Sequence, residues 1–237
     1  MTYPRAERAL ERLLAGIDRC APDASVWILG SLALGDFVPS RSDVDLVIVG
    51  VQPIPDLARA PLDVTWLATV DELATRPLGA VTAAMLHRHG VALRGPDPAG
   101  VVADVDHATL AAAMIANLDA YWEPWLTRAR RTLGRIAALH PRRVEWGVFG
   151  VPRMLVTLGD GRIVSKTEGA LALRDRVDPP WRRIIDEALR IRGQRRGSSY
   201  RSPFERARDM LAFVAHAIDL ARRVRLPRGG VVHTPPP

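Results

Sequence analysis

The stretch WILGSLALGDFVPSRSDVDLVIVG, residues 27–50, contains two apolar runs that flank a turn of small residues and a pair of acids. Apolar runs of this length, bounded by turn residues, are typical of short buried strands. Gly30 permits a tight turn and the close approach of a ligand, and Ser31 is expected to cap a short helix. The stretch therefore predicts a strand, a turn, a helix and a second strand.

Two acids stand at the entrance of the second strand. Asp43 and Asp45 are one residue apart, so they are expected to point the same way while Val44 faces the core. Adjacent carboxylates repel each other unless a cation compensates them. Magnesium suits this role because it prefers oxygen ligands and often binds one or two carboxylates together with substrate phosphates. Because a helix N-terminus binds anions, the turn at Gly30 and Ser31 is the expected phosphate site.

The rest of the chain predicts an α+β/α class with two domains. Residues 1–105 alternate helices with strands, which indicates an α/β catalytic domain with a small mixed sheet. Residues 106–226 have helical spacing and predict a helical bundle, whereas 227–237 are expected to form a disordered tail. Strands are expected at 25–29, 45–50, 62–68 and 90–95, and helices at 5–19, 70–89, 144–158, 166–175, 180–192 and 203–225. A further helical stretch from Thr109 is expected to be interrupted at Pro124.

Composition limits the classes of function. The 237 residues are 48% apolar, enough for a core, and show neither a membrane-spanning run nor a signal peptide. One cysteine excludes an internal disulfide framework and a multi-cysteine metal site. The net charge is +7, because 32 arginines and one lysine outnumber 26 acidic residues. A GC-rich coding bias explains the arginine content, so nucleic acid is not the expected partner. A cytoplasmic monomer without a membrane partner is expected.

Asp63 is a third candidate acid. It lies in LDVTWLA, and no other strand-like run contains an acid in its interior. An acid in an apolar strand is costly unless it is paired or functional. Asp63 is therefore the candidate general base, which would take a proton from an attacking hydroxyl group.

The single lysine, Lys166, stands at a predicted helix start. Ser165 and Glu168 have capping-box spacing, which places the first helical residue at Lys166. A cation is unfavourable at a helix N-terminus, so binding of a phosphate would explain why Lys166 stands there. Arg153 lies thirteen residues earlier, on a preceding helix.

These motifs resemble the nucleotidyltransferase superfamily, whose signature is a Gly-Ser turn followed by two acids on a strand. The second half resembles the C-terminal domain of the aminoglycoside (3″)(9) adenylyltransferases, which modify streptomycin and spectinomycin; Arg153, Gly161 and Lys166 match its pattern. The resemblance implies ATP as cosubstrate, and it implies two Mg²⁺ ions held by Asp43, Asp45 and Asp63, with Asp63 as the base. It also implies a nucleotide site formed by Gly30, Ser31, Ser42, Arg153 and Lys166, the last two from the second domain.

The chain departs from the family at several places. The family base is usually glutamate, and the aromatic tract that follows the base strand in streptomycin-modifying members is missing. Ahead of Arg153 there are arginines where the family has acids, which leaves Glu145 as the candidate contact to a cationic substrate. Pro152 is expected to break or kink its helix.

The sequence thus predicts an ATP-dependent O-adenylyltransferase that acts on a hydroxyl of a small molecule, an aminocyclitol or aminoglycoside. Two alternatives stay open. One is a nucleotidyltransferase that acts on a protein or RNA partner, as antitoxin-like enzymes do. The other is a non-catalytic nucleotide-binding module.

Overall fold

The structure, a computed structural model, describes residues 4–39, 41–50, 62–68 and 78–224, the third of these ranges as backbone alone. The chain forms two compact units, Met1–Val105 with Ser165–Thr167, and Asp106–Val164 with Glu168–Pro237. The tail expected at 227–237 and the first part of the helix expected at 70–89 lie outside the described residues. Within these residues, no helix has the length and apolar content needed to cross a bilayer.

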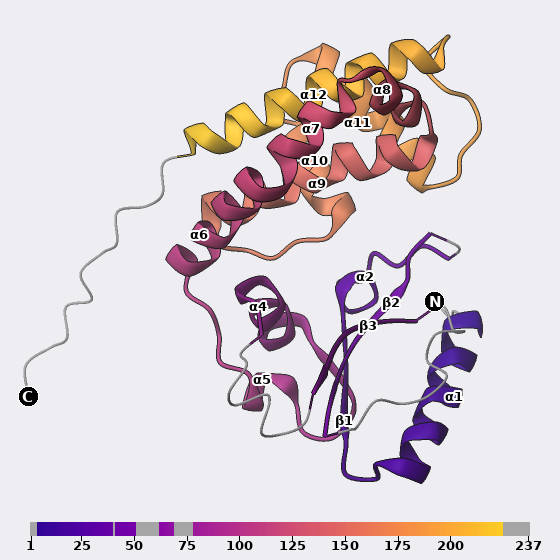
Figure 1. The fold of residues 1–237 in the computed structure, drawn as a ribbon, viewed down its shortest axis with the longest axis vertical. Coiled ribbons are helices and arrows are strands. Elements are labelled where there is room, and N and C mark those ends of the chain that lie inside the picture. Colours follow the sequence, from indigo (N-terminus) through magenta and orange to yellow (C-terminus); the bar gives the residue numbers. More distant parts are fainter. Residues whose placement is uncertain (1–3, 40, 51–61, 69–77, 225–237) are drawn as a thin grey trace, which may run out of the picture. The chain divides into compact units, whose positions relative to one another are not determined.

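The first unit is built on a four-stranded mixed sheet in the order β3-β2-β1-β4 (Figure 1). Strand β1 is antiparallel to both of its neighbours, and β2 is parallel to β3. The small mixed sheet predicted from the sequence is confirmed. The strands are β1 (Ser25–Leu29), β2 (Val44–Val49), β3 (Leu62–Ala68) and β4 (Val91–Arg94), and the helices are α1 (Pro4–Cys20), α2 (Gly30–Ala33), α4 (Ala80–His89) and α5 (Pro98–Val101).

Strand β2 is buried on both faces, because alternate residues enter different cores. Val44, Leu46 and Ile48 pack in a core with the apolar stripe of α1. Val47 and Val49 pack in a second core with α4. Figure 1 shows the two helices on opposite sides of the sheet. Strand β2 is therefore held in place by a hydrophobic core on each face of the sheet.

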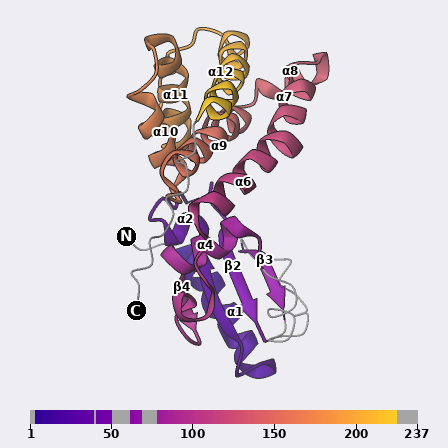
Figure 2. The same cartoon turned by 90° about the vertical axis from the view of Figure 1, so that its left-hand side faces the viewer.

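The regular secondary structure of the second unit is helical in its described part, with loops between the helices (Figure 2). Its central helix is α9, which packs against α6, α11 and α12. Helix α10 begins at Lys166, as the sequence predicts, and its first two residues group with the first unit. The elements are α6 (His107–Asn117), the π-helical segment η2 (Leu118–Trp122), α7 (Glu123–Ala129), α8 (Thr132–Ala138), α9 (Pro141–Asp160), α10 (Lys166–Arg174), α11 (Pro179–Arg192) and α12 (Pro203–Arg223).

The two prolines expected to disturb helices differ in their effect. The α-helix is interrupted just before Pro124 by the π-helical segment η2, and Pro124 stands in the first turn of α7, as the sequence predicts. A π turn accommodates a residue that has no N–H and that crowds the preceding turn. Pro152 lies inside the continuous helix α9, so the expected break is wrong. The extensive burial of α9 outweighs the cost of about 3 kcal/mol that an interior proline imposes.

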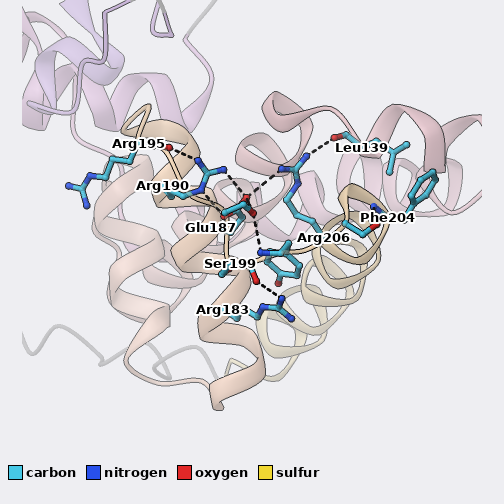
Figure 3. Close-up of polar contacts among 11 residues, drawn as sticks. Leu139, Arg183, Glu187, Arg190, Arg195, Ser199, Phe204 and Arg206 are labelled. Atoms are coloured by element: carbon cyan, nitrogen blue, oxygen red, sulfur yellow. Dashed lines mark hydrogen bonds and ion pairs between the residues drawn. The ribbon is translucent and has the colours of Figure 1, made fainter.

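A buried carboxylate joins three elements of the second unit (Figure 3). Glu187 on α11 accepts hydrogen bonds of 2.8 Å from Nε and Nη2 of Arg190 and from Oγ of Ser198. Arg206 on α12 lies 3.4 Å from the same carboxylate and donates to the carbonyl oxygen of Leu139 at 2.8 Å. Burial alone would raise the pKa of Glu187, but the bonds from Arg190 and Ser198 and the nearby arginine charges outweigh it and leave that pKa lowered.

Candidate nucleotide and metal site

The turn between β1 and α2 depends on Gly30. Its φ of +69° lies in the left-handed region, which residues with a Cβ rarely adopt. Helix α2 begins at Gly30 itself, with Leu29 as the N-cap, so the expectation that Ser31 caps this helix is wrong. Ser31 instead lies inside α2, and its carbonyl oxygen accepts from the N–H of Asp36 at 2.8 Å.

The carboxylate of Asp45 packs against this turn. A Cβ on residue 30 would lie 1.8 Å from Oδ2 and 2.7 Å from Cγ of Asp45, so Gly30 is required for space as well as for conformation. The antiparallel register pairs Asp45 with Leu29, the last residue of β1. The strand pairing and the glycine together bring one predicted metal ligand against the predicted phosphate turn.

Burial alternates around the acidic pair as the sequence predicts. Val44 is 1% exposed and belongs to the core, whereas Asp43 is exposed and Asp45 is half-buried. Asp43 lies one residue before β2 and Asp45 is the second residue of that strand. The two acids therefore stand at the start of a rigid strand, accessible to a ligand.

Asp63 is placed by the backbone of β3. The parallel register pairs its Cα with that of Asp45, and each residue is the second of its strand. Among the residues whose side chains are described, no three His, Cys, Asp or Glu residues form a group able to hold a metal ion. The side chain of Asp63 is outside that set. The donor chemistry of Asp43, Asp45 and Asp63 fits magnesium, because carboxylate oxygens are hard ligands.

Ser42 closes the loop that leads into β2. Its Oγ accepts from the N–H of Val38 at 3.1 Å, and its own N–H donates to the carbonyl oxygen of Val38 at 2.9 Å. A serine hydroxyl that accepts one bond keeps its proton as a donor. On the other side of the turn, the N–H of Gly30 donates to Sδ of Met85 on α4 at 3.2 Å.

Lys166 groups with the acids rather than with the helices beside it in sequence, since Ser165–Thr167 belong to the first unit. The residue after it, Thr167, donates from N and Oγ1 to the carboxylate of Asp36 at 3.2 and 2.7 Å. Glu168, the proposed partner of Ser165 in a capping box, accepts from Arg162 at 3.0 Å. The start of α10 is therefore held by an acid from far away in the sequence.

Arg153 lies on α9 where that helix crosses α10. A Cβ on Gly169 would lie 2.8 Å from Cγ of Arg153 and 3.0 Å from its backbone N and Cα, so glycine allows this close approach. Gly169 follows Lys166 by three residues, about one helical turn. Gly161, with a φ of +75°, ends α9 and starts the connection to α10. The matched Arg, Gly and Lys residues thus belong to one helix–turn–helix segment.

Glu145, the candidate contact to a cationic substrate, is buried in an ion pair. Its Oε1 lies 3.0 Å from Nη1 of Arg192, and the side chains of the two residues are 12% and 4% exposed. Its charge is therefore already compensated by an arginine. The role of Glu145 toward substrate stays a prediction.

Sequence reasoning did not identify Asp36, Met85 or Arg192 as partners of the candidate site residues. The only local pattern at Asp36 is its position after Gly35, just beyond α2, and this pattern does not indicate a partner. Met85 and Arg192 had none, since each contact joins residues that are 55 and 47 positions apart. Contacts at such separations depend on the fold rather than on a sequence pattern.

Comparisons with known proteins agree with the geometry. A family model of the nucleotidyltransferase domain matches residues 10–82, and the model of the aminoglycoside adenylyltransferase C-terminal domain matches residues 100–218. One similar solved structure is that of spectinomycin adenyltransferase AAD(9) from Enterococcus faecialis with ATP and spectinomycin. It is 10% identical, has a TM-score of 0.61 and covers 92% of this chain and 99% of its own. No curated protein matches the sequence significantly. These matches confirm the predicted fold.

Proposed function

Because the chain belongs to the nucleotidyltransferases that carry the aminoglycoside adenylyltransferase C-terminal domain, we propose that it transfers AMP from ATP to a hydroxyl group of a small molecule. The proposal is carried by one observation. The carboxylate of Asp45 packs on the left-handed turn at Gly30, and the strand register pairs Asp45 with Asp63. Acids and a phosphate turn are thus set side by side on rigid strands.

The reaction is an in-line displacement at phosphorus. The substrate hydroxyl oxygen attacks the α-phosphorus of ATP, and the bond from that phosphorus to the bridging oxygen of the β-phosphate breaks. Pyrophosphate leaves with that oxygen, and AMP stays on the acceptor. Asp63 accepts the hydroxyl proton, which makes the attacking oxygen more nucleophilic. Asp63 is a methylene shorter than the glutamate usual in the family, so the acceptor hydroxyl is expected to approach β3 more closely.

Asp43, Asp45 and Asp63 would hold the magnesium ions. When bound, magnesium neutralises charge on the triphosphate and polarises its phosphoryl oxygens. The half-buried position of Asp45 against the Gly30 turn fixes one of these carboxylates in advance. Such fixed ligands need little rearrangement when the nucleotide arrives.

Ser31, Ser42, Arg153 and Lys166 would bind the phosphates. Both serines follow Gly30 in the sequence, Ser31 directly and Ser42 just before β2, and they supply hydroxyl donors. Arg153 and Lys166 supply positive charge, which forms short and strong hydrogen bonds to phosphate oxygens. Their roles rest on the resemblance of their spacing and on the packing of Arg153 against α10.

The acceptor we propose is an aminocyclitol or aminoglycoside. The family model of the second half supports this class, and AAD(9), whose fold is similar, was crystallised with ATP and spectinomycin. The arginine-rich start of α9 and the ion-paired Glu145 favour an aminocyclitol with few charges over a polycationic aminoglycoside.

The test is release of pyrophosphate from ATP and magnesium over a panel of spectinomycin, streptomycin and other aminoglycosides. We expect acceptor-dependent release with at least one of them, which Asp45→Asn abolishes. Tight ATP binding with no release over the whole panel would point to a protein or RNA acceptor. A parent protein that binds no ATP would refute the proposal.

A further inference from the structure

We propose that Asp36 is a positioning residue that couples the phosphate turn to Lys166, a role that rests on the proposed function. Asp36 follows α2, and both carboxylate oxygens accept from Thr167. The N–H of Thr167 lies 3.2 Å from Oδ2, and its Oγ1 lies 2.7 Å from Oδ1. These residues are 131 positions apart in the sequence and belong to the same compact unit.

The same residue is tied to the phosphate turn through its backbone. The N–H of Asp36 donates to the carbonyl oxygen of Ser31 at 2.8 Å. A short chain of hydrogen bonds therefore runs from Ser31 to Asp36 and on to Thr167, which directly follows Lys166 in α10. Two proposed phosphate ligands are linked by one intervening side chain.

The hydrogen bonds from Thr167 to Asp36 stabilise the N-terminus of α10. Thr167 is the second residue of α10, so its N–H is one of those that the helix itself leaves without an acceptor. A carboxylate at this end stabilises the helix, whereas the cation of Lys166 opposes the helix dipole. Asp36 thus performs the N-cap function from outside the helix, and it allows a lysine to stand at an unfavourable position.

The same pair of hydrogen bonds between an aspartate and a threonine occurs away from the proposed site. Asp106 accepts from the N–H of Thr109 at 2.7 Å and from its Oγ1 at 3.1 Å, and it caps α6 in the second unit. Asp106→Asn removes a charge from the same kind of fork, so it reports the cost of losing such a cap without a link to the phosphate turn.

The experiment measures magnesium–ATP affinity by calorimetry and thermal stability for the full-length parent, Asp36→Asn, Asp106→Asn, Lys166→Ala and the double variant Asp36→Asn/Lys166→Ala. We expect Asp36→Asn to weaken ATP binding by about fivefold, the scale of a lost cap, and Asp106→Asn to leave it unchanged. Because Asp36 acts through Lys166, adding Asp36→Asn to Lys166→Ala should cause no further loss of affinity.

The outcomes separate this inference from the proposed function. A parent that binds no ATP refutes both. A parent that binds ATP, with an Asp36→Asn variant that binds it equally well, overturns the positioning role and leaves the proposed function in place. Equal additional weakening by Asp36→Asn in the presence and absence of Lys166 would also overturn it, since Asp36 would then act by another route.

Discussion

The carboxylate of Asp45 occupies the space that a side chain on Gly30 would need. A Cβ at residue 30 would lie 1.8 Å from Oδ2 of Asp45. Only a movement of the Asp45 side chain would relieve this overlap. The turn that would bind phosphate therefore leaves the space that the metal-binding acid occupies, so the two positions are structurally coupled. A change at one of these positions is expected to act at the other.

Gly30→Ala is expected to reduce activity severely, because it combines backbone strain with displacement of Asp45. The matched control is Gly35→Ala: Gly35 has a φ of +68°, but nothing lies within 4 Å of the Cβ position. Both variants should lose about 1–2 kcal/mol of unfolding free energy to the left-handed conformation. Denaturant unfolding and pyrophosphate release measure the two effects. Equal activity in the two variants would show that displacement of Asp45 is unimportant.

Asp43→Asn should weaken magnesium-dependent ATP binding by about tenfold, since it removes one charged ligand of the proposed metal site. The side chain is exposed, so the unfolding free energy should change by less than about 0.5 kcal/mol. Calorimetric titration with ATP in the presence and absence of magnesium measures the effect. Unchanged affinity for magnesium–ATP would remove Asp43 from the metal site.

Asp63→Asn should retain most ATP affinity but lower turnover by about a hundredfold or more, the usual contribution of a positioned base. Turnover is measured as pyrophosphate release with an identified acceptor. Asp63→Glu, which restores the family's usual residue, is the companion variant and should keep more activity than the amide. If Asp63→Asn turns over at the parent rate, the hydroxyl proton leaves by another route.

The local geometry of the acids was predictable from the sequence, because the two-residue period of a strand places Val44 inside and its neighbours outside. The start of α10 at Lys166 was predictable for a similar reason, from a local capping pattern. The position of Ser31 in α2 was not, since α2 begins at Gly30, two residues before the start that a Ser31 cap predicts. Local patterns thus give the elements, and their first residues only in some cases.

Non-local pairings could not be predicted from residue patterns. The register of Asp45 with Asp63 depends on how β2 and β3 align, which no residue pattern in either strand fixes. The contact of Asp36 with Thr167 and the pairing of Glu145 with Arg192 arise only after the helices have packed. For Glu145, tertiary packing supplies a buried arginine partner that the stretch around it does not predict, and its contact to substrate stays a prediction.

The Glu187 cluster predicts an acid-sensitive fold. The pKa of Glu187 in the folded protein is below its ordinary value of 4.5, so the ionised carboxylate stabilises the fold above pH 4.5. This contribution is lost as the pH falls through the lowered pKa. Glu187→Gln should therefore lose about 1–3 kcal/mol at neutral pH and show a shallower decline of stability in acid.

The control for this prediction is Asp186→Asn on the same helix. Asp186 forms an exposed ion pair with Arg174, which is expected to contribute less than about 1 kcal/mol. Urea unfolding at a series of pH values compares the two variants with the parent. A parallel decline for the parent and Glu187→Gln would show that the buried cluster does not control acid stability.

The crossing of α9 and α10 gives the last prediction, which concerns Arg153. Gly169→Ala places a Cβ 2.8 Å from Cγ of Arg153 and 3.0 Å from its backbone, so the helices must separate or the arginine must move. We expect a loss of about 1–3 kcal/mol in unfolding free energy and weaker ATP binding, because overpacking forces backbone shifts. Gly159→Ala is the control, since it adds a Cβ to α9, the helix that carries Arg153, with nothing within 4 Å, and should be neutral or stabilising by up to about 1 kcal/mol. If Gly169→Ala lowers stability but leaves ATP affinity at the parent value, Arg153 supports the helix crossing and does not bind the nucleotide.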